Sequence, residues 1–201
     1  MVDLFDTINN RVMVREFMET PIKKGEKERI LESAIRAPTA SGSEQWLFIT
    51  VDSEAKRNRL YDLLIEAQKV YFGKMLRKPW PKKRIDKWLK DAEAGLFKAP
   101  FYVAVFVDLK QRFCTIPQIE EMWAHQSVAA AIENMLLVAT GLGIGGCWFG
   151  VPLLIDNDFY DLLCENREEM QLAAILGFGY PKEKKSPRHR KKGLKDVVKS
   201  L

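Results

Sequence analysis

The chain has little of what builds disulfide frameworks and metal centres. Its 201 residues include three cysteines and two histidines. The cysteines form no C-x-x-C pair, and their odd number argues against a disulfide framework or a zinc site. We therefore expect free thiols in or near the core, and no bound metal.

Long hydrophobic runs are also missing. No apolar run reaches the roughly 18 residues that a membrane span needs. The longest apolar stretch, 129–150, is interrupted by Glu133, Asn134 and several glycines. Asp3 and Asp6 come early, where a secretory signal would carry basic and then apolar residues. These absences predict a cytoplasmic protein without a membrane partner.

Hydrophobic residues nevertheless make up 47% of the chain, which is enough for a sizeable core. We see no internal repeat or dividing linker and expect one domain over residues 1–201. Apolar patterns predict helices over 3–10, 27–36, 54–74, 84–97, 119–140 and 156–164, and strands over 47–51, 101–107, 143–149 and 172–177. Helices that alternate with strands predict an α/β or α+β sandwich around a sheet.

The net charge of +5 is spread unevenly. Cations gather in the segments 74–90 and 182–192. Such clusters suit anionic ligands or nucleic acid, and the alternative is a solvated face or tail. No nucleic-acid recognition motif accompanies them, so we expect no nucleic-acid partner. The acidic pair Glu120-Glu121 is expected to be solvated.

Three glycines, Gly141, Gly143 and Gly146, have the spacing of a dinucleotide-binding fingerprint. That fingerprint follows a strand and opens a helix, whereas these glycines follow a predicted helix and open a predicted strand. They are better interpreted as a helix stop followed by close packing of the next backbone segment.

Two arginines near the N-terminus, Arg11 and Arg15, are four residues apart and face the same side of either a helix or a strand. Their planar guanidinium groups could converge on a phosphate, or both could simply be exposed. No catalytic triad is evident, because Ser41 and Ser43 have no histidine partner nearby in the sequence.

Three segments in this order resemble the nitroreductase family of flavin enzymes: 11–17, 34–46 and 141–150. The resemblance runs through nearly the whole chain. It implies an α+β fold, a three-layer sandwich with a mixed central β-sheet flanked by helices. It also implies a homodimer whose active sites are built at the interface.

The resemblance assigns the FMN phosphate to basic residues at both ends of the chain. Arg11, Arg15 and Phe17 match the family's first motif, while Val12 and Met13 replace a frequent basic residue and a serine. The basic tail, 182–201, offers Arg188, Arg190 and Lys191, of which Arg190 and Lys191 fit best.

The rest of the cofactor site is implied by the other two segments. The loop at 37–46 would run along the flavin of the partner subunit, with Gly42 in place of an asparagine and Gln45 in place of a proline. The backbone N–H of Gly150 would point at flavin N5. The remaining cofactor-binding candidates are Pro38, Thr39, Ala40, Gln68, Trp148 and Phe149.

The implied activity is an FMN-dependent oxidoreductase. It would pass a hydride from NAD(P)H through flavin N5 to a small molecule, namely a nitroaromatic, a quinone or a similar conjugated acceptor. No catalytic side chain is expected, since the flavin carries the chemistry. Residues 70–97 would form a variable lid whose cations and aromatic residues Tyr71, Phe72, Trp80 and Trp88 meet the substrates. The alternatives are a dehalogenase, a flavin-fragmenting enzyme and a non-catalytic FMN-binding module.

Overall fold

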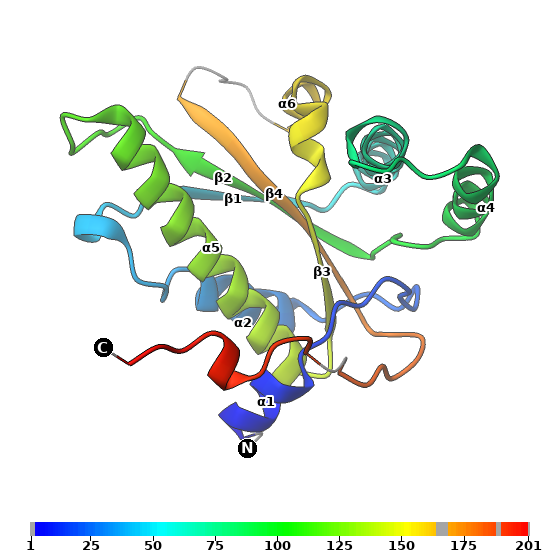
Figure 1. The fold of residues 1–201 in the computed structure, drawn as a ribbon, viewed down its shortest axis with the longest axis horizontal. Helices are drawn as coiled ribbons and strands as arrows, with labels where there is room; N and C mark the ends of the chain where they lie inside the picture. Colours follow the sequence, from blue (N-terminus) through cyan, green and yellow to red (C-terminus); the bar gives the residue numbers. More distant parts are fainter. Residues whose placement is uncertain (1–2, 164–168, 188–189, 201) are drawn as a thin grey trace.

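The computed structural model describes residues 3–163, 169–187 and 190–200. It is a three-layer α+β sandwich in which a four-stranded sheet lies between two groups of helices (Figure 1). The helices are α1 (Leu4–Asn10), α2 (Lys24–Ala34), α3 (Glu54–Val70), α4 (Lys82–Glu93), α5 (Pro117–Gly141) and α6 (Asp156–Leu163). The strands are β1 (Trp46–Val51), β2 (Phe101–Asp108), β3 (Gly145–Phe149) and β4 (Met170–Gly179). No helix in these ranges is long and apolar enough to cross a bilayer.

The sheet has the order β1-β2-β4-β3, and its three strand pairs are all antiparallel. The expected mixture of strand directions is therefore wrong for the four strands. Strands β2 and β3, which α5 connects, do run in the same direction, but β4 lies between them. Among the described residues, parallel pairing is limited to one isolated bridge, between Met13 and Gly146.

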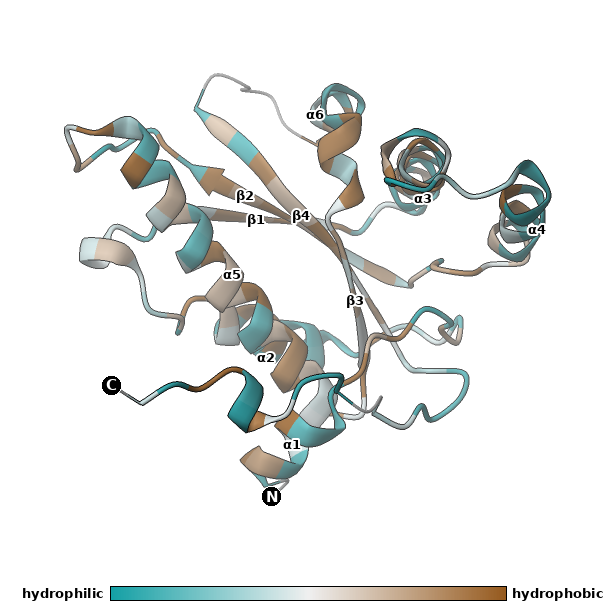
Figure 2. Ribbon diagram, viewed as in Figure 1, coloured by the Kyte–Doolittle hydropathy of each residue, from teal (hydrophilic) through white to brown (hydrophobic). Residues whose placement is uncertain are grey.

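Side chains that alternate along β2 fill a separate core on each face of the sheet. Phe101, Val103 and Val105 pack with residues of α2 and α5. Tyr102 and its alternate neighbours pack with residues of α3, α4 and α6. Figure 2 shows the resulting hydrophobic strands between the helices, with hydrophilic residues on the outer sides of α3 and α4 and a mixture of hydrophobic and hydrophilic residues on α5. Both faces are buried because successive side chains of a strand point to opposite faces.

The glycines after α5 stop the helix and then admit a second backbone segment. Gly143 has a φ of 75°, and the Ile144 N–H donates to the Ala139 carbonyl at 2.8 Å. These are the left-handed residue and the hydrogen bond of a Schellman stop. A Cβ on Gly145 would lie 2.6 Å from the Val14 side chain, and one on Gly146 would lie 2.4 Å from Leu136. The interpretation of these glycines as a stop with close packing is confirmed.

Close packing at these glycines joins the N-terminal segment, 11–17, to the edge of the sheet. The Val14 N–H donates to the Gly146 carbonyl at 3.0 Å, and Val14 itself is buried. Further along, the Phe97 N–H donates to the Arg15 carbonyl at 2.6 Å. The segment that carries Arg11 and Arg15 is therefore fixed by one backbone hydrogen bond to β3 and by another to the loop before β2.

Glu120 corrects the expectation of a solvated acidic pair, because its side chain is fully buried, while Glu121 is half-buried and pairs with Arg112 at 3.2 Å. Its carboxylate accepts hydrogen bonds from Gln45 Nε2 (3.0 Å), the Phe113 N–H (2.7 Å) and Arg112 (3.3 Å). Burial alone would raise the pKa of Glu120, but these donors hold its pKa below the usual value. The buried carboxylate thus ties the loop before β1 to the start of α5.

Replacing Gly145 with alanine should destabilise the fold by about 1–3 kcal/mol, because a methyl group would overlap the stiff side chain of Val14. Urea denaturation followed by circular dichroism measures the change. Gly25→Ala is the matched control: nothing lies within 4 Å of its new Cβ, in helix α2. The control should be neutral or stabilising by up to about 1 kcal/mol. Equal midpoints for Gly145→Ala and the wild type would contradict the packing argument.

Replacing Glu120 with glutamine should lower the melting temperature near neutral pH. The folded-state pKa of Glu120 lies below its unfolded value, so the ionised form stabilises the fold above the unfolded pKa. That contribution is lost as the pH falls through the folded pKa. The difference in melting temperature between the wild type and the variant should then become smaller. Glu121→Gln, at the half-buried neighbour that contacts Arg112, should lower the melting temperature less. If the difference in melting temperature between Glu120→Gln and the wild type is the same at pH 7 and at pH 3, this account is wrong.

Candidate functional site

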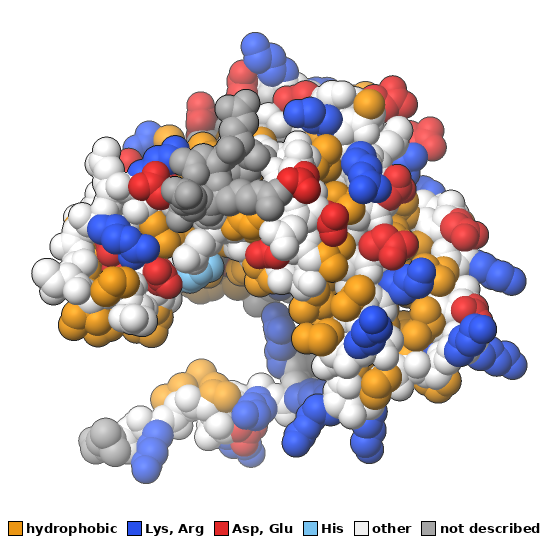
Figure 3. Space-filling model, turned by 90° about the horizontal axis from the view of Figure 1, so that it is seen from above, with side chains coloured by type: hydrophobic (Ala, Val, Ile, Leu, Met, Phe, Trp, Pro, Cys, Tyr) orange, Lys and Arg blue, Asp and Glu red, His pale blue; other side chains and the backbone are white. Residues whose placement is uncertain are grey.

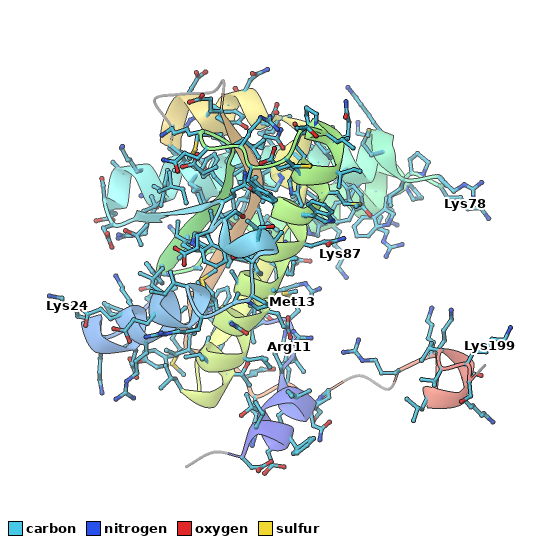
Figure 4. The ribbon with its side chains drawn as sticks, turned by 90° about the vertical axis from the view of Figure 1, so that its left-hand side faces the viewer. Arg11, Met13, Lys24, Lys78, Lys87 and Lys199 are labelled. Carbon is cyan, nitrogen blue, oxygen red and sulfur yellow. The ribbon has the colours of Figure 1, made fainter. Side chains whose placement is uncertain are left out.

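A cavity of about 670 Å³ lies where the N-terminal segment meets the basic tail. Arg11 and Met13, labelled in Figure 4, lie on the side of the body that faces this tail. Among the residues that the structure describes, the lining consists of Ile8, Asn9, Arg11, Val12, Met13, Arg15, Lys185, Ser186, Pro187, Arg190 and Lys191. Six of the residues expected to hold FMN are therefore neighbours in space: Arg11, Val12, Met13, Arg15, Arg190 and Lys191. Arg188, the remaining tail candidate, lies outside the described residues.

The cavity is strongly cationic. Arg11 Nε lies 3.2 Å from Glu133 Oε1, and Lys185 Nζ lies 3.0 Å from Glu16 Oε2. The other three cations of the lining, Arg15, Arg190 and Lys191, have no carboxylate partner among the residues that the structure describes. An excess of unpaired positive charge in a concave site favours an anionic ligand.

Met13 has a structural role at the position where the family pattern has serine. Its Sδ accepts a hydrogen bond from the Trp148 N–H at 3.1 Å. The thioether therefore pairs with the backbone of β3, and a thioether has no proton to donate to an anion. Anion binding in the cavity therefore gains no hydrogen bond from position 13.

The end of β3 combines packed rings with open space. Phe149 is buried and packs edge-on against Phe97, with ring centroids 5.5 Å apart. Trp148 is half-buried and packs on the opposite face of the sheet. Gly150 is exposed, and a Cβ there would meet no atom within 4 Å. The backbone at Gly150 is thus accessible to a flat ligand.

Gln68 is the described residue with an unsatisfied buried polar atom. It lies near the end of α3, is 5% exposed, and its Nε2 has no hydrogen-bond partner. Helix α3 also packs against η3 (Val151–Leu154), the turn that directly follows Gly150. A buried donor without a partner is costly unless a ligand or water satisfies it.

The loop that carries Pro38, Thr39, Ala40 and Gly42 lies apart from the cavity. The Ala40 N–H donates to Ser127 Oγ at 3.3 Å, which holds the loop against the first half of α5. Figure 1 shows this cyan loop on the far side of α5 from β3. Within a single subunit, the loop therefore does not lie next to Arg11 or Gly150.

The backbone of this loop is strained and held by its surroundings. Ser41 and Glu44 adopt φ values of 52° and 49°, in the left-handed region that non-glycine residues rarely occupy. The buried pair of Gln45 and Glu120 lies directly next to them. Such strain persists only where neighbouring contacts determine the conformation, and it is frequent at binding sites.

The segment predicted as a lid is built around stacked rings. Helix α3 ends at Val70, and one π-helical turn, Tyr71–Met75, follows. Phe72 stacks on Trp80 with centroids 3.9 Å apart, and the Arg84 guanidinium lies 3.8 Å from the centre of the Trp80 ring. Phe72 also meets the buried Trp88 edge-on. These rings contact one another, and of the four predicted aromatic contacts Tyr71 is the exposed one.

Six residues of the site were not named from the sequence: the lining residues Ile8, Asn9, Lys185, Ser186 and Pro187, and Glu133 behind Arg11. Lys185 belongs to the basic tail and could have been singled out only by its position there. Glu133 meets Arg11 from the middle of α5, and no local pattern pairs residues so far apart in the chain. Only the fold reveals that contact.

Known proteins resemble the chain along most of its length. The model of the nitroreductase family matches residues 8–180. The 5,6-dimethylbenzimidazole synthase of Rhodospirillum rubrum is 29% identical over 178 residues, covering 85% of this chain and 78% of the synthase. A protein of Archaeoglobus fulgidus, provisionally named NADH dehydrogenase/NAD(P)H nitroreductase, is 28% identical over 186 residues. The match covers 92% of this chain and 89% of the Archaeoglobus protein.

Solved structures share the fold. A nitroreductase with bound FMN from Bacteroides fragilis superposes with a TM-score of 0.67 at 23% identity, covering all of both chains. The family match extends over most of the chain and includes both the N-terminal segment and β3. The chain therefore belongs to the nitroreductase family.

Proposed function

We propose that the protein is an FMN-dependent oxidoreductase that takes electrons from NAD(P)H and passes them to a small conjugated acceptor. The observation that carries the proposal is the cationic cavity where Arg11 and Arg15 meet Arg190 and Lys191. Membership of a family of oxidoreductases supports the reaction class.

The cavity fits a phosphate group. A phosphomonoester carries about −1.5 to −2 charges near neutral pH and three strong acceptor oxygens. Arginine binds such oxygens through a planar fork of N–H donors. Because Met13 is paired with β3, the phosphate would be held mainly by Arg11, Arg15, Arg190 and Lys191, without a contact from position 13.

The flavin ring would lie beside the end of β3. Gly150 leaves open space there and offers a backbone N–H to the reactive ring, with Val151 close by. Gln68 contributes a buried amide donor that lacks a protein partner. Trp148 and Phe149 would form the apolar surroundings. When bound, FMN would supply the hydride chemistry, while these residues bind, orient and tune it.

We further propose a homodimer in which each subunit completes the other's site. The loop containing Thr39 and Gly42 lies on the other side of α5 from β3 (Figure 1), so it cannot contact a flavin bound beside β3 of the same subunit. The C-terminal tail stands clear of the body in Figures 3 and 4, and its Leu194, Val197 and Val198 are 58–78% exposed. Exposed apolar side chains of this kind fit an interface between subunits.

A second candidate function is consumption of the flavin itself. It is favoured by the 29% identity to a 5,6-dimethylbenzimidazole synthase. Reductive dehalogenation and FMN binding without turnover are compatible with the same residues. Products formed from FMN under air would identify the flavin-consuming reaction, and halide release would identify the dehalogenase. A bound FMN that NAD(P)H cannot reduce would identify the non-catalytic module.

The direct test is a visible absorption spectrum of the purified protein, followed by addition of NADH or NADPH without oxygen. We expect flavin absorption that bleaches on addition of nucleotide and returns with a quinone or nitroaromatic. The Arg11→Ala, Arg15→Ala double variant should remain folded and bind FMN about 100-fold more weakly or worse, since charge-assisted hydrogen bonds contribute about 1.5–3 kcal/mol each. A wild-type protein that refuses added FMN would refute the proposal.

The cations of the lid should assist binding of the anionic nucleotide. Lys87 is exposed on α4 and lies on the opposite side of the molecule from Lys24, as Figure 4 shows. Lys87→Glu should raise the KM for NAD(P)H by about threefold at low ionic strength, and the effect should shrink in salt. Lys24→Glu is the matched control, because it changes the net charge equally on the other side. The same KM change in both variants would show that the lid has no special part.

A further inference from the structure

Arg11 is not free in the cavity, because a carboxylate outside the lining holds it. Its Nε lies 3.2 Å from Oε1 of Glu133, and the Arg11 side chain is 19% exposed. Glu133 is not part of the lining and comes from the middle of α5. The contact joins the central helix to the N-terminal segment.

We infer that Glu133 is a positioning residue of the phosphate cavity, an inference that rests on the proposed FMN-binding function. Guanidinium has five N–H donors, one of them on Nε. Because Nε is the Arg11 atom nearest to Glu133, the four N–H donors of the two terminal amino groups remain for a phosphate. One carboxylate can therefore orient the fork without occupying it.

The helix that carries Glu133 is a rigid support. Its neighbours Ile132 and Met135 are buried, and Asn134 Nδ2 donates to the Ser33 carbonyl of α2 at 3.1 Å. Arg11, in contrast, belongs to a segment that follows the short and largely exposed helix α1. A long arginine side chain loses considerable rotamer freedom when it binds. If the Arg11 side chain is already ordered before the phosphate binds, less entropy is lost on binding and the phosphate is bound more tightly.

Glu133 also places a negative charge near the proposed phosphate. The two effects oppose each other: orientation of Arg11 strengthens phosphate binding, and repulsion weakens it. Glu133 is 48% exposed, so water and salt screen its repulsion. Orientation acts through a direct 3.2 Å contact with the largely buried Arg11 side chain, so we expect it to outweigh the screened repulsion.

Two substitutions separate these effects. Glu133→Ala removes both the acceptor and the charge, and should weaken FMN binding by about 3- to 10-fold, the cost of ordering one long side chain. Glu133→Gln keeps an acceptor oxygen for Arg11 Nε but removes the charge. It should bind FMN at least as tightly as the wild type does.

The experiment is titration of each protein with FMN and with riboflavin, followed by flavin fluorescence. Riboflavin lacks the phosphate, so its affinity should be the same in the wild type and both variants. Glu121→Ala is the matched control on the same helix, about 18 Å away along its axis. It should leave both affinities unchanged.

Any other pattern of affinities would overturn either the inference about Glu133 or the proposed function. Tighter FMN binding by both variants would mean that Glu133 only repels the phosphate, and would overturn the inference. Unchanged binding by both, equal losses in both, or a parallel loss of riboflavin affinity would overturn it as well. A wild-type protein that binds no FMN would instead refute the proposed function, so the two failures are distinguishable.

Discussion

The contact between the N-terminal segment, 11–17, and strand β3 is the constraint on which the candidate site depends. It exists because Gly145 and Gly146 have no side chains where Val14 and Leu136 pack. Backbone pairing at Gly146 then fixes the direction of the segment. Val14 is buried against the sheet while its neighbours Met13 and Arg15 line the cavity, as alternating side chains of an extended segment do. The two glycines thus allow the segment that carries both arginines to lie beside β3.

The elements themselves could be predicted from the sequence, since strong apolar patterns mark them. Helices α2 and α5 and strands β1 and β2 lie within a few residues of the expected ranges. Strand direction could not be predicted in this way, because a helix between two strands does not reveal that β4 separates them. The burial of Glu120 was also hidden. An acidic residue beside another acidic residue is usually solvated, and only the fold supplies donors from Gln45 and Phe113.

The candidate site was predictable to the extent that its motifs are local. Arg11, Arg15, Arg190 and Lys191 could be named from their motifs, and the structure brings them into one cavity. Their binding of FMN remains a proposal. The loop at 37–46 could be named as well, but its strained conformation depends on Gln45 and the buried Glu120. The contact of Arg11 with Glu133 arises from packing of distant elements, which a sequence pattern does not record.

The most direct test of the central claim compares the affinities of the wild-type protein for FMN and for riboflavin. The two ligands share the ring system and differ in the phosphate that the cationic cavity is proposed to hold. If several charge-assisted hydrogen bonds hold the phosphate, FMN should bind about 100-fold more tightly or better, and the advantage should decline with added salt. Equal affinities would show that the cavity between Arg11, Arg15, Arg190 and Lys191 is not the phosphate site.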